Sequence, residues 1–488
     1  MTDWTFHRDQ IRTFRFVRSR FDARTGVAQL IYVFDDGPEL VETVTVPGAP
    51  FVMDDARAAA AQRALRLLHL IAGVSYYKAA VPAEIRIEDE GIDAATAALL
   101  ELIYRNGLGE FAYRNGLELR DRIRFPALLP SPPGRGAGGE GRGDSAVSDA
   151  VSVESEPSPQ PLSRGERGLP AALGLRPHAL VAIGGGKDSL VSIEALRGAG
   201  VEQTVTWIGG SQLIAACAAR TGLPTLNIGR QLAPQLFDFN RRGAWNGHIP
   251  VTAVNSAILA FAAVLLGVNQ VVFSNERSAS YGSLIPGTGE VNHQWSKGWA
   301  FEAAFGEHLQ RHVAADLDYY SLLRPLSELA VARQFAKSDR YDDCFSSCNR
   351  NFHILGERPT SRWCGVCPKC LFVFLALAPF LPKLRLVGIV GRNLLDDPDL
   401  IPGYDALLEF GNHKPFECVG EGRESRAAMA ALAQRPEWRE DAVIKRFAKL
   451  IAPQLDPAEL AVEPLLALHD ERRIPAALWE RLRDRFAA

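Results

Sequence analysis

The chain has 488 residues, of which 47% are hydrophobic, and its formal net charge is −3. This composition indicates a globular protein that is long enough for two or three domains. The slightly acidic balance argues against a protein held to nucleic acid mainly by phosphate contacts.

Neither a membrane nor a secreted location is expected. The longest apolar runs, Ala257–Val268 and Leu371–Phe380, are shorter than the roughly 20 residues that cross a bilayer. Met1–Thr13 is polar and charged and lacks the apolar core of a signal peptide. Seven cysteines are too few for a disulfide scaffold in a chain of this length. The sequence therefore predicts a cytoplasmic protein without a membrane partner.

The first part of the chain predicts an N-terminal α+β domain over residues 1–128. Three segments alternate apolar and polar residues, which favours an antiparallel meander, and two later segments have helical periodicity. The strand-like segments are Thr13–Asp22, Val27–Asp36 and Leu40–Pro47, and the helical ones are Ala56–Val74 and Asp93–Gly116. This region contains no recognisable catalytic constellation.

A low-complexity insertion is predicted at residues 129–170. Its central part, Pro130–Arg167, is rich in Pro, Gly, Ser and charge and has almost no large apolar side chains. That composition is typical of a disordered, solvated linker. An arginine-bearing tether for a partner is the alternative interpretation.

Strands and helices alternate after the insertion, which predicts a parallel sheet covered on both faces. Strands are expected at residues 179–183, 204–208, 224–228 and 270–275, and helices at 189–198, 211–221 and 251–267. Ligands of such sheets gather at the carboxyl ends of the strands. We assign residues 171–383 to this α/β domain and residues 384–488 to a helical C-terminal region that packs onto it.

A glycine-rich turn, GGGKDS, follows the first strand of this domain. It is not a P-loop, because Val181 stands where the first glycine of that motif falls and Asp188 follows the lysine. The dinucleotide fingerprint also fails, because Ser189 occupies its third glycine position. A strand, a glycine run and a helix N-terminus still form a cradle of N–H groups for an anion.

We therefore predict that this turn binds a polyphosphate. The residues concerned are Gly184, Gly185, Gly186, Lys187, Asp188 and Ser189. Asp188 could help to hold the Mg²⁺ that accompanies the polyphosphate. A turn that only packs the helix against the strand is the alternative.

The strand–GGxDS–helix arrangement resembles the PP-loop of the N-type ATP pyrophosphatases, usually written SGGxDS. Gly184 stands where that family has serine, which removes one hydroxyl contact and leaves the backbone cradle. The resemblance implies that the chain binds ATP and Mg²⁺, cuts ATP between the α and β phosphates, and transfers AMP to a substrate oxygen.

Five of the seven cysteines lie between Cys344 and Cys370. Cys364, Cys367 and Cys370 form a C-x2-C-x2-C run that places three thiolates around one knuckle, and Cys348 can complete a tetrahedron. We expect these four residues to bind a structural Zn²⁺, with Cys344 spare or exchanging with Cys348. An iron–sulfur cluster is the alternative centre.

The cysteine pattern is similar to the zinc site of the PP-loop enzyme that makes 7-cyano-7-deazaguanine. In that enzyme a Ser-Cys is followed by Cys-Gly-x-Cys-x-x-Cys, as in Ser347-Cys348 and Cys364–Cys370 here. The N-terminal domain and the helical tail exceed what that compact enzyme carries, so a different substrate is expected.

Two polar stretches are candidate substrate-binding regions, because polar loops at strand ends usually bind ligands. The stretch Ser274–Glu302 contains Glu276, Arg277, His293, Trp295 and Lys297. The stretch Gly411–Ser425, inside the helical tail, contains His413, Lys414, Glu417, Cys418 and Arg423. The available acid–base groups are Glu276, His293, Lys297, His413, Glu417 and Cys418. A cysteine such as Cys418 is more often a buried small hydrophobe than a proton shuttle.

Several motifs together resemble the ATP-dependent UDP-N-acetylmuramoyl-L-alanyl-L-glutamate epimerases of some bacteria. They are GGGKDS, SNERSAS, VNHQWSKGW, SLLRPLSELAVARQF, CNRNF and RWCGVCPKC. The resemblance runs from about residue 10 to 450 and is interrupted only by the insertion. That family inverts the terminal L-glutamate of a peptidoglycan precursor to D-glutamate and converts ATP to AMP and pyrophosphate.

The resemblance implies a nucleotide-sugar dipeptide substrate and a carboxyl-adenylate intermediate, with no nucleic acid or membrane partner. The expected catalytic residues are Lys187, Asp188, Ser189, Glu276, Lys297 and Cys418, and the expected substrate contacts are Arg277, His293, Trp295, Lys414 and Arg423. The residues themselves do not single out the epimerisation base or the oligomeric state. Two other functions stay open: a PP-loop enzyme that modifies a base or tRNA, and a non-catalytic nucleotide-binding zinc module.

Overall fold

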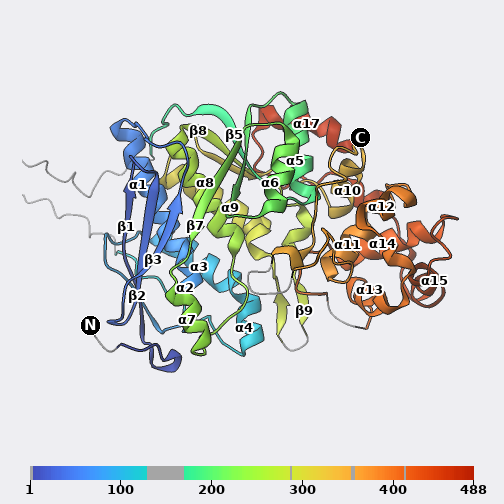
Figure 1. Cartoon of the computed structure of the whole chain (residues 1–488), viewed down its shortest axis with the longest axis horizontal. Coiled ribbons are helices and arrows are strands. Elements are labelled where there is room, and N and C mark those ends of the chain that lie inside the picture. Colours follow the sequence, from blue (N-terminus) through green and yellow to red (C-terminus); the bar gives the residue numbers. More distant parts are fainter. Residues whose placement is uncertain (1–3, 129–169, 286–287, 353–357, 412–413) are drawn as a thin grey trace, which may run out of the picture.

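One mixed sheet of nine strands organises residues 13–321 (Figure 1). The computed structural model describes residues 4–128, 170–285, 288–352, 358–411 and 414–488, so the predicted insertion, apart from Pro170, and His413 lie outside the described residues. The strand order is β11-β8-β5-β6-β7-β3-β2-β1-β4. The strands are β1 (Thr13–Asp22), β2 (Val27–Phe34), β3 (Leu40–Thr45), β4 (Glu84–Ile87), β5 (Arg176–Ala182), β6 (Gln203–Ile208), β7 (Thr225–Gln231), β8 (Val268–Phe273) and β11 (Asp318–Ser321).

Both predicted strand patterns are confirmed, and the structure joins them. β1, β2 and β3 form an antiparallel meander, whereas β5, β6, β7, β8 and β11 run parallel. The antiparallel pairing of β3 with β7, in which Val44 lies opposite Arg230, makes a single sheet of the two sets. The division into domains at the predicted boundaries stays a prediction.

Helices cover both faces of the parallel strands. Neighbouring residues of a strand point to opposite faces, so Leu180 and Val271 enter one core and Val181 and Val272 the other. The first core contains α1 (Asp55–Ala72), α3 (Ala94–Gly107), α8 (Val251–Leu266) and α9 (Trp299–His312), and the second contains α5 (Lys187–Gly198), α6 (Gln212–Thr221), α10 (Glu328–Ala336) and α11 (Pro368–Leu377). Shorter helices are α2 (Val74–Tyr77), α4 (Gly109–Asn115) and α7 (Gln235–Arg241).

The single helical pattern predicted at Asp93–Gly116 is divided into α3 and α4 at Leu108. Glycines, which are poor helix formers, stand on both sides of this residue. Gly107 also packs on Pro250 so closely that an added Cβ would lie 2.5 Å from the ring. The break lets α4 contact β10 (Gly289–Val291), which pairs with β9 (Ser283–Ile285) in a separate hairpin.

The helical C-terminal region predicted from residue 384 is confirmed, and it packs onto the second core. Its helices are α12 (Lys383–Val390), α13 (Ile401–Leu407), α14 (Gly422–Ala433), α15 (Ala442–Arg446), α16 (Glu463–Leu466) and α17 (Ala476–Ala487). In Figure 1 most of them lie at the end of the molecule opposite β1, while α17 returns to the parallel sheet. There Arg333 of α10 donates hydrogen bonds to the carbonyls of Phe486 and Ala487.

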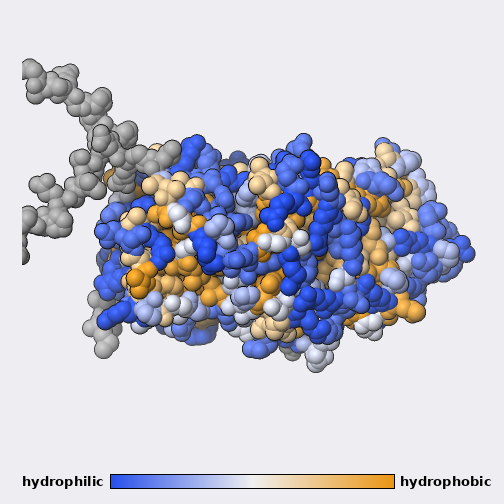
Figure 2. Space-filling view, turned by 90° about the horizontal axis from the view of Figure 1, so that it is seen from above, coloured by the Kyte–Doolittle hydropathy of each residue, from blue (hydrophilic) through white to orange (hydrophobic). Residues whose placement is uncertain are grey.

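Hydrophilic and hydrophobic residues are interspersed over the face of the molecule that Figure 2 shows. Among the described residues, none of the helices combines the length and the apolar character that a membrane span requires. The predicted cellular location stays a prediction.

Candidate active site

The site lies at the carboxyl ends of the neighbouring parallel strands β5 and β8, whose following strands lie on opposite sides of the pair. β5 lies between β8 and β6, and the chain continues from β5 to β6 but from β8 to β11 on the other side. Loops that diverge in this way leave a crevice at the carboxyl ends of the strands. The loop after β5 contains GGGKDS, and the loop after β8 contains Glu276. The strand order therefore brings these two distant segments together.

The glycine turn leads directly into the N-terminus of α5, which no N-cap side chain occupies. Gly185 has a φ of +77°, a conformation that favours glycine. Gly186 is the N-cap of α5 and has no side chain to occupy the first N–H groups of that helix. The Ser189 hydroxyl donates back to the Gly186 carbonyl at 3.1 Å. A turn of this form suits an anion, and binding of a polyphosphate there stays a prediction.

Three carboxylates and two lysines meet beside this turn. Lys187 is fully buried and forms ion pairs with Asp188 and Glu328. Lys369 Nζ lies 3.4 Å from the other oxygen of Glu328. Oxygens of Asp188, Glu276 and Glu328 all lie within 4.8 Å of one another. Oxygen ligands at this spacing could hold a divalent cation.

Burial and charge set the ionisation of these carboxyl groups. Burial, followed by the charges of Glu328 and Asp188, raises the pKa of Glu276 to about 7. Burial also opposes ionisation of Glu328, but Lys187 and Lys369 outweigh it and lower the pKa of that group.

Arg324 fixes the backbone of two segments of the site. Its guanidinium is fully buried and pairs with Glu302 at 2.9 Å. It also donates to the backbone carbonyls of Glu276, at 2.8 Å, and of Lys297. One arginine therefore fixes the backbone on which two predicted catalytic side chains stand.

Arg324→Met is expected to lower the free energy of unfolding by about 3–5 kcal/mol, because it leaves Glu302 buried without its cation. Urea denaturation followed by circular dichroism measures this change. The control is Arg311→Met, which removes an exposed i,i+4 partner of Glu307 and should cost less than about 1 kcal/mol. Equal effects of the two variants would contradict the role of Arg324.

A second group of titratable side chains surrounds Cys418. Lys297 Nζ donates to the Cys418 sulfur at 3.2 Å. His293 also hydrogen-bonds with Cys418, while its Nδ1 contacts Glu110 of α4. Burial by itself would raise the pKa of the Cys418 thiol, but Lys297 and His293 outweigh it and lower that pKa to about 5. Burial raises the pKa of the adjacent Glu417 to about 7.

Four of the cysteines converge as the spacing predicts. The sulfurs of Cys348, Cys364, Cys367 and Cys370 lie within 4.8 Å of one another. The sulfurs of Cys364 and Cys370 are 3.7 Å apart. Tetrahedral zinc with Zn–S bonds of about 2.3 Å needs sulfurs about 3.8 Å apart, so the cluster fits a metal ion.

The cysteine cluster is linked directly to the glycine turn. Ser346, two residues before Cys348, donates its N–H to the Gly185 carbonyl at 2.9 Å. A Cβ on Gly186 would lie 2.8 Å from the Ser347 hydroxyl, so that glycine is needed for the close approach. Cys344 stands outside the cluster, and its carbonyl accepts a hydrogen bond from Cys217.

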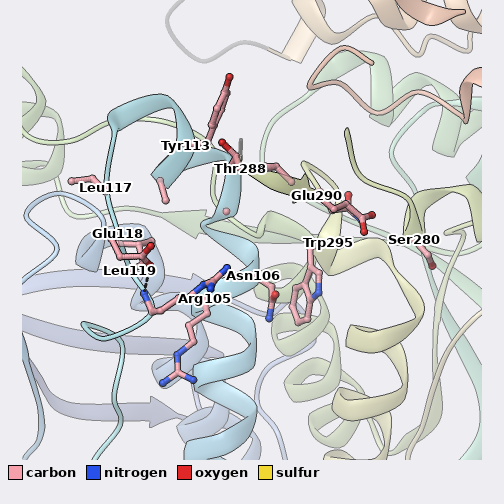
Figure 3. Close-up of a pocket in the computed structure, with 15 residues that line it drawn as sticks. Arg105, Asn106, Tyr113, Leu117, Glu118, Leu119, Ser280, Thr288, Glu290 and Trp295 are labelled. Carbon is pink, nitrogen blue, oxygen red and sulfur yellow. Dashed lines mark hydrogen bonds between the residues drawn. The ribbon is translucent and has the colours of Figure 1, made fainter. Parts of the chain in front are cut away.

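Cavities open around the β9–β10 hairpin. One of about 730 Å³ lies between α3, α4 and the hairpin, and Figure 3 shows Arg105, Asn106, Trp295 and Ser280 among the residues that line it. A second, of about 760 Å³, is lined by Arg277, Trp295 and Arg423, and a third, of about 510 Å³, by Lys414 and Arg423. Volumes of this size accommodate organic ligands.

The structure places four of the five predicted substrate contacts around the cavities. Arg277, Trp295, Lys414 and Arg423 line them, whereas His293 joins the Cys418 group. The Arg277 guanidinium donates to the carbonyls of Ala467 and Leu465, and Lys414 Nζ donates to the carbonyl of Tyr281. The roles of these residues in binding stay predictions.

Glu328, Lys369, Glu110 and His248 also belong to these groups, although the sequence does not single them out. Glu328 follows Ser327, which caps α10, so it is typical of an ordinary first-turn acid. Glu110 has the spacing of an i,i+4 partner for Arg114. The sequence carried no signal that would have distinguished either residue.

The fold and site are those of an α/β enzyme with buried acid–base groups and a four-cysteine cluster. Comparison with protein families shows that the chain belongs to the MurL family. It matches the MurL N-terminal domain over residues 5–138 and 141–322, and the MurL C-terminal domain over residues 344–461.

Three relatives are named UDP-N-acetyl-alpha-D-muramoyl-L-alanyl-L-glutamate epimerase. The protein from Xanthomonas oryzae pv. oryzae (strain MAFF 311018) is 70% identical over 482 residues, 99% of each chain. Those from Micromonospora sp. and Salinispora tropica are each 42% identical, covering 88% of this chain and 89% and 87% of their own. No solved structure matches the chain.

Proposed function

We propose that the protein converts the terminal L-glutamate of UDP-N-acetylmuramoyl-L-Ala-L-Glu to D-glutamate, with ATP cleaved to AMP and pyrophosphate, in the synthesis of a peptidoglycan precursor. The observation that carries this proposal is the 70% identity, over 99% of both chains, to the Xanthomonas epimerase. The glycine turn and the buried acid–base groups support the chemistry.

The substrate explains why ATP is needed. The glutamyl Cα proton lies beside a carboxylate, so its removal would place negative charge next to negative charge. The carboxylate oxygen first attacks the α-phosphorus of ATP, the bond to the β-phosphate oxygen breaks, and pyrophosphate leaves. The resulting acyl adenylate has lost the carboxylate charge, so an enolate becomes accessible. Water then attacks the acyl carbon and releases AMP.

The glycine turn is the proposed ATP-binding PP-loop. Its backbone N–H groups and the N-terminus of α5 suit a polyphosphate. Lys187 is held between Asp188 and Glu328, at the edge of this cradle. Asp188, Glu276 and Glu328 would hold Mg²⁺, which neutralises phosphate charge when bound.

The cavities around the β9–β10 hairpin are the proposed site of the nucleotide sugar. Arg423 lines two of them, and its Nε is buried without a hydrogen-bond partner among the described residues. An unpartnered buried guanidinium nitrogen favours an anionic ligand such as a pyrophosphate or carboxylate. Trp295 offers an indole face to a planar base.

Proton transfer at Cα needs a base on one face and a donor on the other. Glu276, Lys297 and Cys418 are the proposed candidates, because all three lie close to the glycine turn or to one another. The cysteine cluster is the proposed structural Zn²⁺ site, since its sulfur spacing suits one ion held by four thiolates. That ion would fix the Ser346–Ser347 segment against the turn.

The test is to incubate the protein with ATP and UDP-N-acetylmuramoyl-L-Ala-L-Glu. Chromatography measures AMP, and chiral analysis after hydrolysis measures the glutamate. We expect AMP and D-glutamate to form together, and neither to form with an analogue whose terminal α-carboxyl group is blocked as an amide. AMP formation with unchanged L-glutamate would contradict the proposal, and so would epimerisation that needs no ATP.

A further inference from the structure

Four side chains from distant parts of the sequence form one connected group at Cys418. Glu110 belongs to α4, His293 and Lys297 follow the β9–β10 hairpin, and Cys418 lies before α14. Glu110 contacts His293, His293 hydrogen-bonds with Cys418, and Lys297 donates to the same sulfur at 3.2 Å. Proton transfer in enzymes often uses a chain of three contacting groups: a nucleophile or base, a histidine and a carboxylate.

The carboxylate of this group is more deeply buried than its thiol and its lysine. Glu110 is buried, with 4% of its surface exposed, whereas Cys418 and Lys297 are only partly buried. The carboxylate is thus withdrawn from solvent, whereas the residues Cys418 and Lys297 keep part of their surface exposed. Groups that face Cys418 are the cations Lys297, His293 and Lys369 and the carboxyl group of Glu417.

We infer that Cys418 is the base that removes the glutamyl Cα proton, and that Glu110 is a positioning residue that holds His293 against it. This inference rests on the proposed function. The Cys418 thiolate forms a bond to the proton while the Cα–H bond breaks, and the electron pair of that bond moves into the adenylated carboxyl group as an enolate. Return of a proton to the opposite face is a separate step.

The electrostatics agree with this assignment. Burial opposes the charge of His293, but hydrogen bonds with Cys418 and Glu110 raise its pKa to about 9. His293 is then a cation at neutral pH and, together with Lys297, stabilises the thiolate. Removing the charge of Glu110 weakens this support, so the pKa of Cys418 should rise.

Metal binding is the alternative role for part of this group, because ligand atoms of Glu110, His248 and His293 lie within 4.8 Å of one another. His293 already hydrogen-bonds with two protein groups, Glu110 and Cys418, which favours the proton-transfer role.

The experiment uses the full chain with ATP and the dipeptide substrate in D₂O. Mass spectrometry measures deuterium at Cα, and AMP is measured in the same samples. Cys418→Ser should lower deuterium incorporation by about a hundredfold or more and leave AMP release within a few-fold. Glu110→Gln should move the acid limb of the incorporation rate to higher pH by about one unit, so the loss is about tenfold at acidic pH and shrinks as the pH rises.

The matched control is Glu307→Gln, because Glu307 also pairs with an arginine four residues away, Arg311, and both side chains are exposed on α9. It should keep the wild-type profile. The inference is overturned if Cys418→Ser exchanges at the wild-type rate while releasing AMP, if Glu110→Gln loses rate equally at every pH, or if Glu110→Gln removes a metal ion that is additional to the cysteine-bound one. Wild-type protein that releases no AMP would overturn the proposed function as well.

Discussion

Asp188→Ala is expected to lower AMP release by about a thousandfold while the protein stays folded. Asp188 lies at the first turn of α5 beside the glycine cradle, where it contacts Lys187 and faces Glu276 and Glu328. Without its carboxylate, the proposed cation site loses a ligand at the phosphates. The fold should survive, because Lys187 keeps Glu328 as a partner. AMP release with the dipeptide substrate measures the first effect, and circular dichroism the second.

The matched control is Glu194→Ala, on the same helix α5. Glu194 pairs with Arg197 and Tyr341, away from the glycine turn. We expect it to keep AMP release within about threefold, as for a surface-side substitution. An Asp188→Ala protein that releases AMP at a near-normal rate would refute the proposed role of the turn.

Cys370→Ser is expected to remove the bound metal and to lower the free energy of unfolding by about 4 kcal/mol or more, because loss of a metal site is among the most destabilising single changes. The sulfur of Cys370 lies in the buried part of the cluster, and its backbone N–H is held by Cys367. AMP release should also fall, since Ser346 and Ser347 would lose their hold on the glycine turn. Elemental analysis and thermal unfolding measure these effects.

Cys344→Ser is the control, because that thiol stands outside the cluster. It should keep one zinc per chain and a melting temperature close to that of the wild type. Iron with inorganic sulfide in the wild-type protein would contradict the zinc assignment, and a Cys370→Ser protein with full metal content would contradict the ligand set.

The parts of the site that could be predicted from the sequence are those encoded by contiguous residues. GGGKDS is a short segment whose glycines and helix start determine its conformation, and C-x2-C-x2-C brings three thiolates together within one turn. The alternating strands and helices predicted the parallel sheet for the same reason, because hydrophobic periodicity is local. The structure confirms these elements and the convergence of the fourth cysteine.

The remaining parts depend on tertiary packing between distant segments. The pairing of β3 with β7 joins residues such as Val44 and Arg230, and no local pattern predicts which strand covers a sheet edge. Glu110 contacts His293 because the helical segment is interrupted at Leu108, between α3 and α4. Arg277 lines a cavity, and its guanidinium also donates to two C-terminal carbonyls, a contact that no local pattern predicts.

The proposed function depends on activation of the glutamyl carboxylate by ATP as an acyl adenylate. A dipeptide substrate whose terminal α-carboxylate carries oxygen-18 in both positions tests this activation. Attack of that carboxylate on the α-phosphorus transfers its oxygen to the adenylate, and water attacking the acyl carbon leaves it on AMP. Mass spectrometry should find one oxygen-18 atom in each AMP released, together with D-glutamate. Unlabelled AMP formed during epimerisation would contradict the claim.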